Sequence, residues 1–396
     1  MTMADNKDKK VLNVPALRFP EFSGEWKSVH LEEIAEFQKQ RISTALLNNN
    51  NYISTENILQ DFEGIQYSSS IPTNTNVIEY QKGDILLSNI RPYLKKVWFS
   101  DRKGGCSADV FVLRGDKCDQ HFLYYVIASD RFINYVMSGV KGVKMPRGDK
   151  SQMEKYAFSI PTNTEQRKIA KFLSMLDERI RLQNKIIEDL KKLMSAISLL
   201  LFSECFANDK LVPLKSISNS IKRKNDGQIH PIMMISAEHG FINQSEKYDK
   251  DNAGNSLSNY TLLYKGELSY NRGSSKSKKF GSVFSLLIQS ALVPHVYHSF
   301  CMDESVADCT FYSLLLNSRL LDKELVKVVS STARMDGLLN ISKEDFFSIK
   351  VPLPCIDKQR SITNILQKIN IKIKREKNIQ SLLCLQRKYL LSQMFI

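Results

Sequence analysis

The sequence has little of what marks secreted, membrane-spanning or metal-holding proteins. Its seven cysteines are scattered, and none belongs to a CxxC pair. This usage is typical of a reducing compartment and argues against a disulfide or zinc framework. The longest apolar stretches fall short of the roughly 20 residues that a membrane-spanning helix needs, and residues 1–10 are too polar for a signal peptide. We therefore expect a cytoplasmic protein.

Catalytic motifs are also lacking. There is no GxxxxGK[ST] phosphate loop, no GxGxxG turn and no Asn- or Asp-Pro-Pro-aromatic motif of an amino-methyltransferase. Glu25-Trp26-Lys27 has the Glu-x-Lys form found in nucleases, but it stands alone. His295 and His298 lack cysteine or acidic companions, and His239 has no triad spacing. We expect neither a catalytic site nor a metal site in this chain.

Positive charge is what the sequence has in excess. Lys plus Arg number 56 against 42 Asp plus Glu, which gives a formal net charge of +14. Such an excess favours a polyanionic partner, although a solvated basic surface explains the charge alone equally well. With 396 residues the chain is too long for one compact core, so two domains are expected.

The two halves of the chain repeat each other. Residues 160–167 (IPTNTEQR) recur 193 positions later as residues 353–360 (LPCIDKQR), with proline, glutamine and arginine in the same places. Upstream an offset of 183 takes over, at which residues 82–84 (KGD) correspond to residues 265–267 (KGE). Because the matches keep their order, we interpret the chain as an internal duplication with a short insertion or deletion in one copy.

Each copy ends in a predicted long helix. From Glu165 to Phe202 there is no glycine or proline, and apolar residues follow the alternating spacing of a coiled-coil seam. Thr162 and Glu165 form a capping-box pattern at the start. Such a helix is about 57 Å long at 1.5 Å per residue. The second helix is predicted from Asp357 to Phe395, with a weaker seam.

Antiparallel pairing of these helices is expected because a domain lies between them. Under full overlap Gln183 faces Gln380 as a polar registry pair. The alternative is two ordinary core helices, although five heptads exceed a typical globular helix. The predicted seam consists of Ile169, Leu173, Leu176, Ile180, Ile187, Leu190, Ile362, Leu366, Ile369, Ile373, Leu383 and Leu390.

The remaining parts, residues 29–159 and 212–351, mix short strand patterns with helices and show no βαβ rhythm. The expected fold class is therefore α+β: two mixed α/β domains, each followed by a long helix, with the helices paired in pseudo-twofold symmetry. Strands are predicted at 77–80, 84–88, 96–100, 109–113, 282–288 and 309–314, and helices at 121–137 and, as its counterpart, 318–329.

Two basic loops recur in each copy, one after the Lys-Gly-Asp or Lys-Gly-Glu turn and one before the long helix. Arg, Lys and Asn in loops bind phosphates and read guanine and adenine edges. A solvated charged loop is the alternative for any single residue, but recurrence of both loops favours nucleic-acid contact. The candidate contact residues are Asn89, Arg91, Lys95, Lys96, Lys141, Lys144, Arg147, Asn271, Arg272, Lys276, Lys278, Lys279, Arg334 and Asn340.

Two variable domains, each followed by a helix that opens with Pro-x-x-x-x-Gln-Arg, resemble the specificity (S) subunit of type I restriction-modification systems. Residues 15–22 (PALRFPEF) and 24–26 (GEW) are similar to the start of that family. The resemblance covers nearly the whole chain. It implies an N-terminal segment (1–28), target-recognition domain 1 (29–160), a central helix (161–205), target-recognition domain 2 (206–353) and a C-terminal helix (354–396).

The resemblance also implies a non-catalytic subunit that reads double-stranded DNA. Each recognition domain would read one half of a split, asymmetric site, and the helices would hold the readers apart and dock two methyltransferase (M) subunits. These subunits would methylate adenine N6, and added motor-nuclease (R) subunits would restrict DNA. S-adenosylmethionine, ATP and Mg would then bind the partners, with no cofactor on this chain. The rival hypotheses are a coiled-coil scaffold that binds only protein, and an enzyme active by itself.

Overall fold

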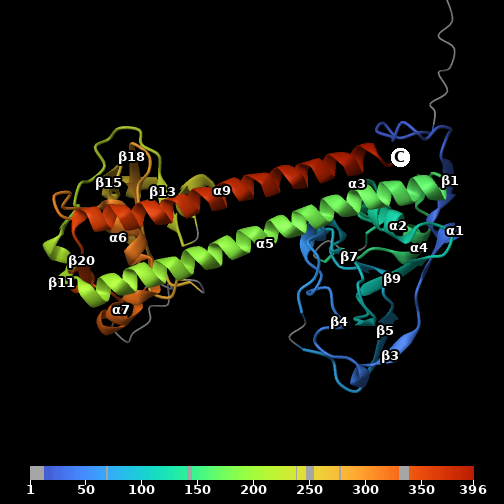
Figure 1. Ribbon diagram of the computed structural model, residues 1–396, viewed down its shortest axis with the longest axis horizontal. Helices are drawn as coiled ribbons and strands as arrows, with labels where there is room; N and C mark the ends of the chain where they lie inside the picture. The colour runs from blue at the N-terminus through green and yellow to red at the C-terminus, as the bar shows by residue number, and fades with distance from the viewer. Residues whose placement is uncertain are drawn as a thin grey trace, which may run out of the picture. The chain divides into compact units, whose positions relative to one another are not determined.

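The computed structural model describes residues 13–67, 70–140, 145–237, 239–246, 254–275, 278–329 and 339–396. The chain forms two compact units, and each unit takes part of both long helices (Figure 1). Unit 1 comprises Met1–Ile186 and Lys377–Ile396, and unit 2 comprises Ile187–Glu376. Within the described ranges, no helix is both long and apolar enough to cross a membrane.

Unit 1 contains two four-stranded sheets. The first has the order β2-β9-β6-β7, with every pair antiparallel. The second has the order β3-β5-β8-β4, in which β4 and β8 run parallel. The strands predicted at 77–80, 84–88, 96–100 and 109–113 are confirmed. The members are β2 (Ala35–Phe37), β9 (Val110–Gly115), β6 (Ile85–Ser88), β7 (Val97–Phe99), β3 (Arg41–Ser43), β5 (Asn76–Tyr80), β8 (Gly104–Cys106) and β4 (Tyr52–Ile53).

Short helices and a two-stranded ladder complete unit 1. The single helix predicted over 121–137 is wrong, because Ser129 takes an extended conformation and its Oγ caps a new helix by accepting from the Phe132 N–H at 3.2 Å. The elements are β1 (Lys27–His30) paired with β10 (Ala157–Ile160), α1 (Leu31–Ile34), α2 (Gln120–Ile127), α3 (Asp130–Ser138), α4 (Lys150–Glu154) and the 3₁₀ turns η1 (Thr44–Leu46), η2 (Gln60–Phe62) and η3 (Pro92–Leu94).

Unit 2 contains a four-stranded antiparallel sheet with the order β12-β19-β16-β17 and three two-stranded ladders. The sheet strands are β12 (Ser218–Ser220), β19 (His298–Met302), β16 (Leu268–Asn271) and β17 (Ser282–Ser285), the last confirming the strand predicted from residue 282. The ladders are β11 (Lys210–Pro213) with β20 (Lys350–Leu353), β13 (Met233–Ser236) with β14 (Gly240–Asn243), and β15 (Thr261–Tyr264) with β18 (Ser290–Val293).

The helices of unit 2 correct one strand prediction. Residues 309–314 were expected to form a strand, but they lie in a helix, because the Asp308 side chain accepts from the Phe311 N–H at 2.8 Å as an N-cap. This helix, and not 318–329, is the counterpart of α2, whose N-cap is Asp119. The elements are α6 (Cys309–Leu316), α7 (Asp322–Val328), α8 (Lys343–Ser348), η4 (Leu214–Ser216), η5 (Gln244–Glu246), η6 (Gly254–Asn259) and η7 (Arg319–Leu321).

The strand registers establish the duplication residue by residue. In unit 1, Lys27 pairs with Ile160 and His30 with Ala157. In unit 2, Lys210 pairs with Leu353 and Pro213 with Lys350. The first partners differ by 183 positions and the second by 193, which are the two offsets of the sequence repeat. The strands β2 and β6 likewise map on β12 and β16 at an offset of 183.

The long helices α5 (Asn163–Asn208) and α9 (Ile356–Gln393) pack together, and each begins before its predicted start. Thr162 and Glu165 do not form the predicted capping box, because the Glu165 carboxylate binds Arg18 instead. The polar pair predicted between Gln183 and Gln380 is displaced by one residue: Gln380 Nε2 donates to Asn184 at 2.7 Å. All of the predicted seam residues given above are buried or half-buried.

The glutamine of the repeated motif ties each long helix to its globular part. Gln166 Oε1 accepts from the Asp119 N–H at 2.8 Å, and Gln166 Nε2 donates to the Pro161 carbonyl at 2.8 Å. Gln359 makes the equivalent bonds to the Asp308 N–H and the Pro354 carbonyl, both at 2.8 Å. Both side chains are buried. A buried amide that loses such partners costs free energy, so the recurrence of this glutamine has a structural cause.

An N-terminal strap fixes the end of the chain within unit 1. Arg18 donates to the buried Glu165 carboxylate at 2.7 and 2.8 Å, and this ion pair raises the pKa of Arg18. The Leu17 N–H donates to the Gln393 carbonyl at 3.0 Å. Leu390, Leu391, Met394 and Phe395 lie in the core of unit 1. The residues that resemble the family start are therefore part of the scaffold.

Candidate nucleic-acid interface

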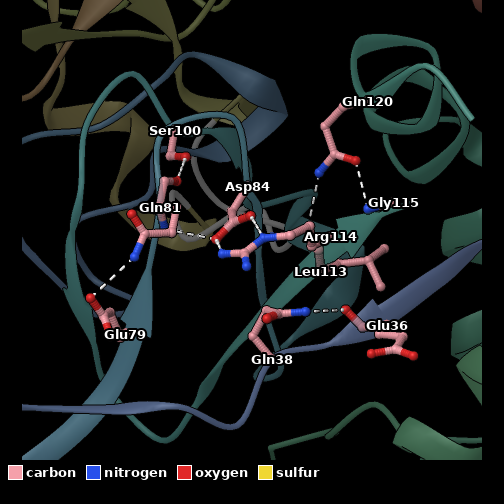
Figure 2. A network of polar contacts seen from close by, with 10 residues as sticks. All are labelled: Glu36, Gln38, Glu79, Gln81, Asp84, Ser100, Leu113, Arg114, Gly115 and Gln120. Atoms are coloured by element: carbon pink, nitrogen blue, oxygen red, sulfur yellow. Dashed lines mark hydrogen bonds and ion pairs between the residues drawn. The ribbon is translucent and has the colours of Figure 1, made fainter. Parts of the chain in front are cut away.

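A rigid turn sets the start of β6, the strand that leads into the first basic loop (Figure 2). Gly83 has a φ of +92°, which disfavours a side chain at this position. The buried Asp84 carboxylate then accepts from Arg114 Nε and Nη2, each at 2.7 Å, and from the Gln81 N–H at 2.7 Å. In unit 2 the turn before β16 has Gly266 at +90°, and Glu267 pairs with Arg223.

The two basic loops of unit 1, which lie far apart in the sequence, are joined by backbone hydrogen bonds. The Arg91 N–H donates to the Pro146 carbonyl at 2.8 Å, and the Gly148 N–H donates to the Asn89 carbonyl at 3.0 Å. Ile90 and Arg147 form an antiparallel bridge between these two contacts. The side chains of both loops therefore belong to a single surface, which we call joined surface 1 (residues 89–96 and 145–148).

Unit 2 joins its loops at the equivalent place. The Leu339 N–H donates to the Arg272 carbonyl at 3.0 Å, and Arg272 Nη1 donates to the Ile341 carbonyl at 3.4 Å. Arg272 directly follows β16 as Asn89 directly follows β6, and the carbonyl oxygen of each accepts a hydrogen bond from the second loop. We call residues 271–275 and 339–341 joined surface 2. The duplication thus extends from the helices to the arrangement of the loops.

The candidate contact residues of joined surface 1 differ in how free their side chains are. Arg91 is exposed, and Arg147 is 54% exposed with a 3.3 Å ion pair to Asp109. Lys95 pairs with Asp130 at the start of α3, and Lys96 Nζ donates to the Thr55 carbonyl at 2.6 Å. Burial lowers the pKa of Lys96. Asn89 is half-buried, with an amide oxygen that has no hydrogen-bond partner among the described residues.

The candidates of unit 2 are also partly engaged within the protein. Asn271 Nδ2 donates to the Ile235 carbonyl at 3.1 Å, and its Oδ1 accepts from the Gly273 N–H at 2.9 Å. Lys278 Nζ donates to the Asn317 carbonyl at 2.5 Å, and burial lowers the pKa of Lys278. Lys279 is exposed and Asn340 is half-buried. Four candidates from the two units lie outside the described residues: Lys141 and Lys144 in unit 1, and Lys276 and Arg334 in unit 2.

Comparison with known proteins shows which proteins the chain is similar to. Residues 23–192 match the model of the type I restriction modification DNA specificity domain. The chain is 25% identical to the type I restriction enzyme MjaVIII specificity subunit of Methanocaldococcus jannaschii, over 94% of this chain and 92% of that one. It is 29% identical to the EcoDI specificity subunit of Escherichia coli over 98 residues, 25% of this chain and 22% of that one.

The chain is thus similar to the specificity subunits of type I restriction-modification systems over nearly its whole length. Solved structures agree in fold. An S subunit from M. genitalium aligns with a TM-score of 0.59 at 18% identity, covering 97% of this chain and 99% of that one. A chain from a structure on complex assembly and conformational transition of the type I R-M system aligns with a TM-score of 0.56 at 17% identity. This alignment covers 93% of this chain and 96% of that one. The resemblance seen in the sequence is thus confirmed.

One polar group of unit 1 was missed in the sequence. Arg387 occupies a seam position of α9, where its guanidinium lies 2.7 Å from Asp177 and stacks 4.8 Å from the Phe62 ring centre. Tyr125 Oη also donates to Asp177 at 2.8 Å, and burial raises the pKa of Asp177. The signal was present, because a charged residue within an apolar seam predicts a buried partner.

His298, one of the histidines weighed in the sequence, has structural surroundings. His298 is buried beside the stacked rings of Tyr270 and Phe346, and its Nε2 lies 3.2 Å from the Ile341 carbonyl, to which a protonated nitrogen donates. Burial lowers the pKa of His298. Among the described residues, no group of three or more His, Cys, Asp or Glu side chains is placed to hold a metal ion.

Proposed function

We propose that this specificity subunit binds a bipartite, asymmetric site in double-stranded DNA, one half through each recognition domain, and directs adenine-N6 methylation and restriction by partner subunits. The observation that carries the proposal is the repeated arrangement of the joined surfaces. Both follow an equivalent strand and bring two separated basic loops together, yet their side chains differ. Equivalent frames with different side chains are what two different half-sites require.

Loop side chains divide the labour within each surface. Arg91 and Arg147 are the more exposed cations of joined surface 1, so they are the better candidates for contact with base edges or phosphates. Lys95 and Lys96 would act mainly by fixing the loop, because their amines already have partners in the protein. Lys95 and Lys96 would then favour DNA binding through their positive electrostatic potential and not through a direct contact.

The chemistry belongs to partners in this proposal. Two methyltransferase subunits would hold S-adenosylmethionine, and motor-nuclease subunits would hold ATP and Mg. Apolar residues on the long helices support a protein interface, because these side chains remain exposed within their own units. They are Phe172, Leu182, Ile186, Ile365, Ile371 and Leu382.

A scaffold that binds only protein is the rival, and the salt dependence of DNA binding separates the two. A DNA reader releases counterions, so its affinity falls steeply with salt in proportion to the number of phosphates it contacts. We expect binding of the full-length chain to duplex DNA with a clear negative slope of log affinity against log salt. Absent binding, or a flat slope, favours the scaffold. Methylation or cleavage by the purified chain alone contradicts the proposed division of labour.

A further inference from the structure

A turn in joined surface 1 is held in a backbone conformation that ordinary side chains avoid. Arg91 and Lys95 bracket η3, and both have a φ of +51°, in the left-handed region. Neither is glycine, so each costs conformational free energy that the surrounding contacts must offset. Such outliers cluster at functional sites, because a strained segment persists only where it is held in place.

The contacts that hold this turn come from three directions. The Arg91 N–H donates to the Pro146 carbonyl in the neighbouring loop, and the Ser88 N–H donates to the Lys96 carbonyl across the base of the turn at 2.9 Å. Lys95 pairs with Asp130 at the first turn of α3. Pro92 is buried and fixes its own φ. The turn is therefore rigid without help from the side chains at its tip.

Tyr93 stands at that tip. Its side chain is 49% exposed, although tyrosine rings generally bury much of their apolar surface. No ring stacking or cation–π contact among the described residues involves Tyr93. Exposed Arg91 precedes it by two positions, and Met145, 48% exposed, lies in the loop that the turn is bonded to. A half-exposed aromatic ring on the surface that also carries an exposed guanidinium and an exposed apolar side chain is unexplained by the stability of unit 1.

We propose that the turn Arg91–Lys95 is the base-reading element of recognition domain 1, in which Tyr93 packs its ring against the base stack and Arg91 reaches a base edge. The inference rests on the proposed function and names the residues that carry it. Aromatic and apolar side chains that press into a base step favour flexible steps, so they read sequence through deformability. Arginine binds the paired acceptors of guanine directly. A rigid turn lowers the entropy cost of both contacts.

The test uses the full-length chain and a randomised duplex DNA library, with selection of the bound sequences. Tyr93→Ala should lose affinity for the wild-type site by at least about fivefold, as for loss of an aromatic–base contact. It should also lose sequence information only in the half-site read by domain 1. Tyr93→Phe keeps the ring and should behave as wild type. The slope of log affinity against log salt concentration should be the same for Tyr93→Ala as for wild type, because tyrosine carries no charge.

Two controls come from the same molecule. Tyr67→Ala removes a tyrosine of the same unit that is 64% exposed and lies outside joined surface 1, and it should change neither affinity nor specificity. The half-site of domain 2 should keep its full information in every variant. Arg91→Ala should lose information at one base pair of the domain 1 half-site.

The outcomes separate this inference from the proposed function. If the wild type selects a two-part site and Tyr93→Ala selects the same site with unchanged affinity, the role of Tyr93 is overturned while the proposed function stands. If Tyr93→Ala loses sequence information equally in both half-sites, the role of Tyr93 is overturned as well, because the effect is then not confined to domain 1. If Arg91→Ala lowers only the salt slope, Arg91 is a phosphate contact and its reading role is wrong. If the wild type selects no site, the proposed function itself fails.

Discussion

The side-chain oxygen of Gln166 accepts a hydrogen bond from the backbone N–H of Asp119 at 2.8 Å. Asp119 in turn caps α2, so one glutamine connects the start of α5 to the start of a helix in the domain core. The same pair occurs as Gln359 and Asp308 in unit 2. The repeated motif therefore marks the joint at which each recognition domain is fixed to the scaffold.

Removing this joint should destabilise one unit at a time. Gln166→Ala leaves the half-buried Asp119 N–H and the buried Pro161 carbonyl without their partner, at a cost of about 1–3 kcal/mol. Hydrogen exchange followed by mass spectrometry should show faster exchange in α2 and little change in α6. Gln359→Ala should give the reverse pattern. Gln393→Ala, a change near the end of α9, is the control. Equal acceleration in both units would contradict a local role.

The strap offers a second test, based on charge. Glu165 is 1% exposed and binds Arg18, whereas the equivalent residue in unit 2, Lys358, binds Asp209 at 3.0 Å. Glu165→Lys should destabilise unit 1 by about 3–5 kcal/mol, because it puts a cation in a buried position that faces the half-buried Arg18 guanidinium. The double variant Arg18→Glu with Glu165→Lys should recover part of the loss in chemical unfolding monitored by hydrogen exchange. A double variant no more stable than Glu165→Lys would show that the pair contributes little.

The turn before β6 provides a third prediction. Asp84→Asn removes the negative charge that three N–H donors share and turns an amide toward Arg114, so we expect a loss of about 2–4 kcal/mol in the stability of unit 1. Asp101→Asn is the matched control, since Asp101 is 61% exposed in its ion pair with Arg102. That change should stay within about 0.5 kcal/mol of wild type. Similar losses in both variants would show that burial of Asp84 is not decisive.

Unit 2 should lose stability on mild acidification because of His298. Burial lowers the pKa of His298 in the folded chain, aided by Arg272 and Lys343 and opposed by the Ile341 carbonyl and Glu344. The unfolded chain, with a histidine pKa of about 6.5, then binds more protons as the pH falls through that value. Stability from this residue is complete above about pH 6.5 and declines below it.

The measurement is the free energy of unfolding between about pH 7.5 and 5.5. His298→Gln keeps a donor for the Ile341 carbonyl and removes the titration, so its stability should change less over this range. His30→Gln is the control, since His30 is exposed. If wild type and His298→Gln lose stability in parallel, the buried histidine is not the cause.

The sequence predicted the repeat better than the details of the domains. The seam and the proline-glutamine-arginine motif have a fixed period, so burial at Leu173 and Leu366 follows from spacing. The helix at 309–316 was missed because its apolar run fits strand and helix equally, and the cap at Asp308 decides between them. The joining of Arg91 to Pro146 had no sequence signal, because the contact is between backbone atoms far apart in the chain.

The most direct test of the central claim is an exchange of one recognition domain. Residues 206–353 are replaced by the corresponding domain of another family member, and the chimaera is expressed with the partner subunits of the natural complex. Single-molecule sequencing of the methylated genomic DNA then gives the modified sites. The account predicts that one half of the site changes and that the other half and the adenine-N6 modification persist. A change in both halves, or in neither, would contradict two independent readers on one scaffold.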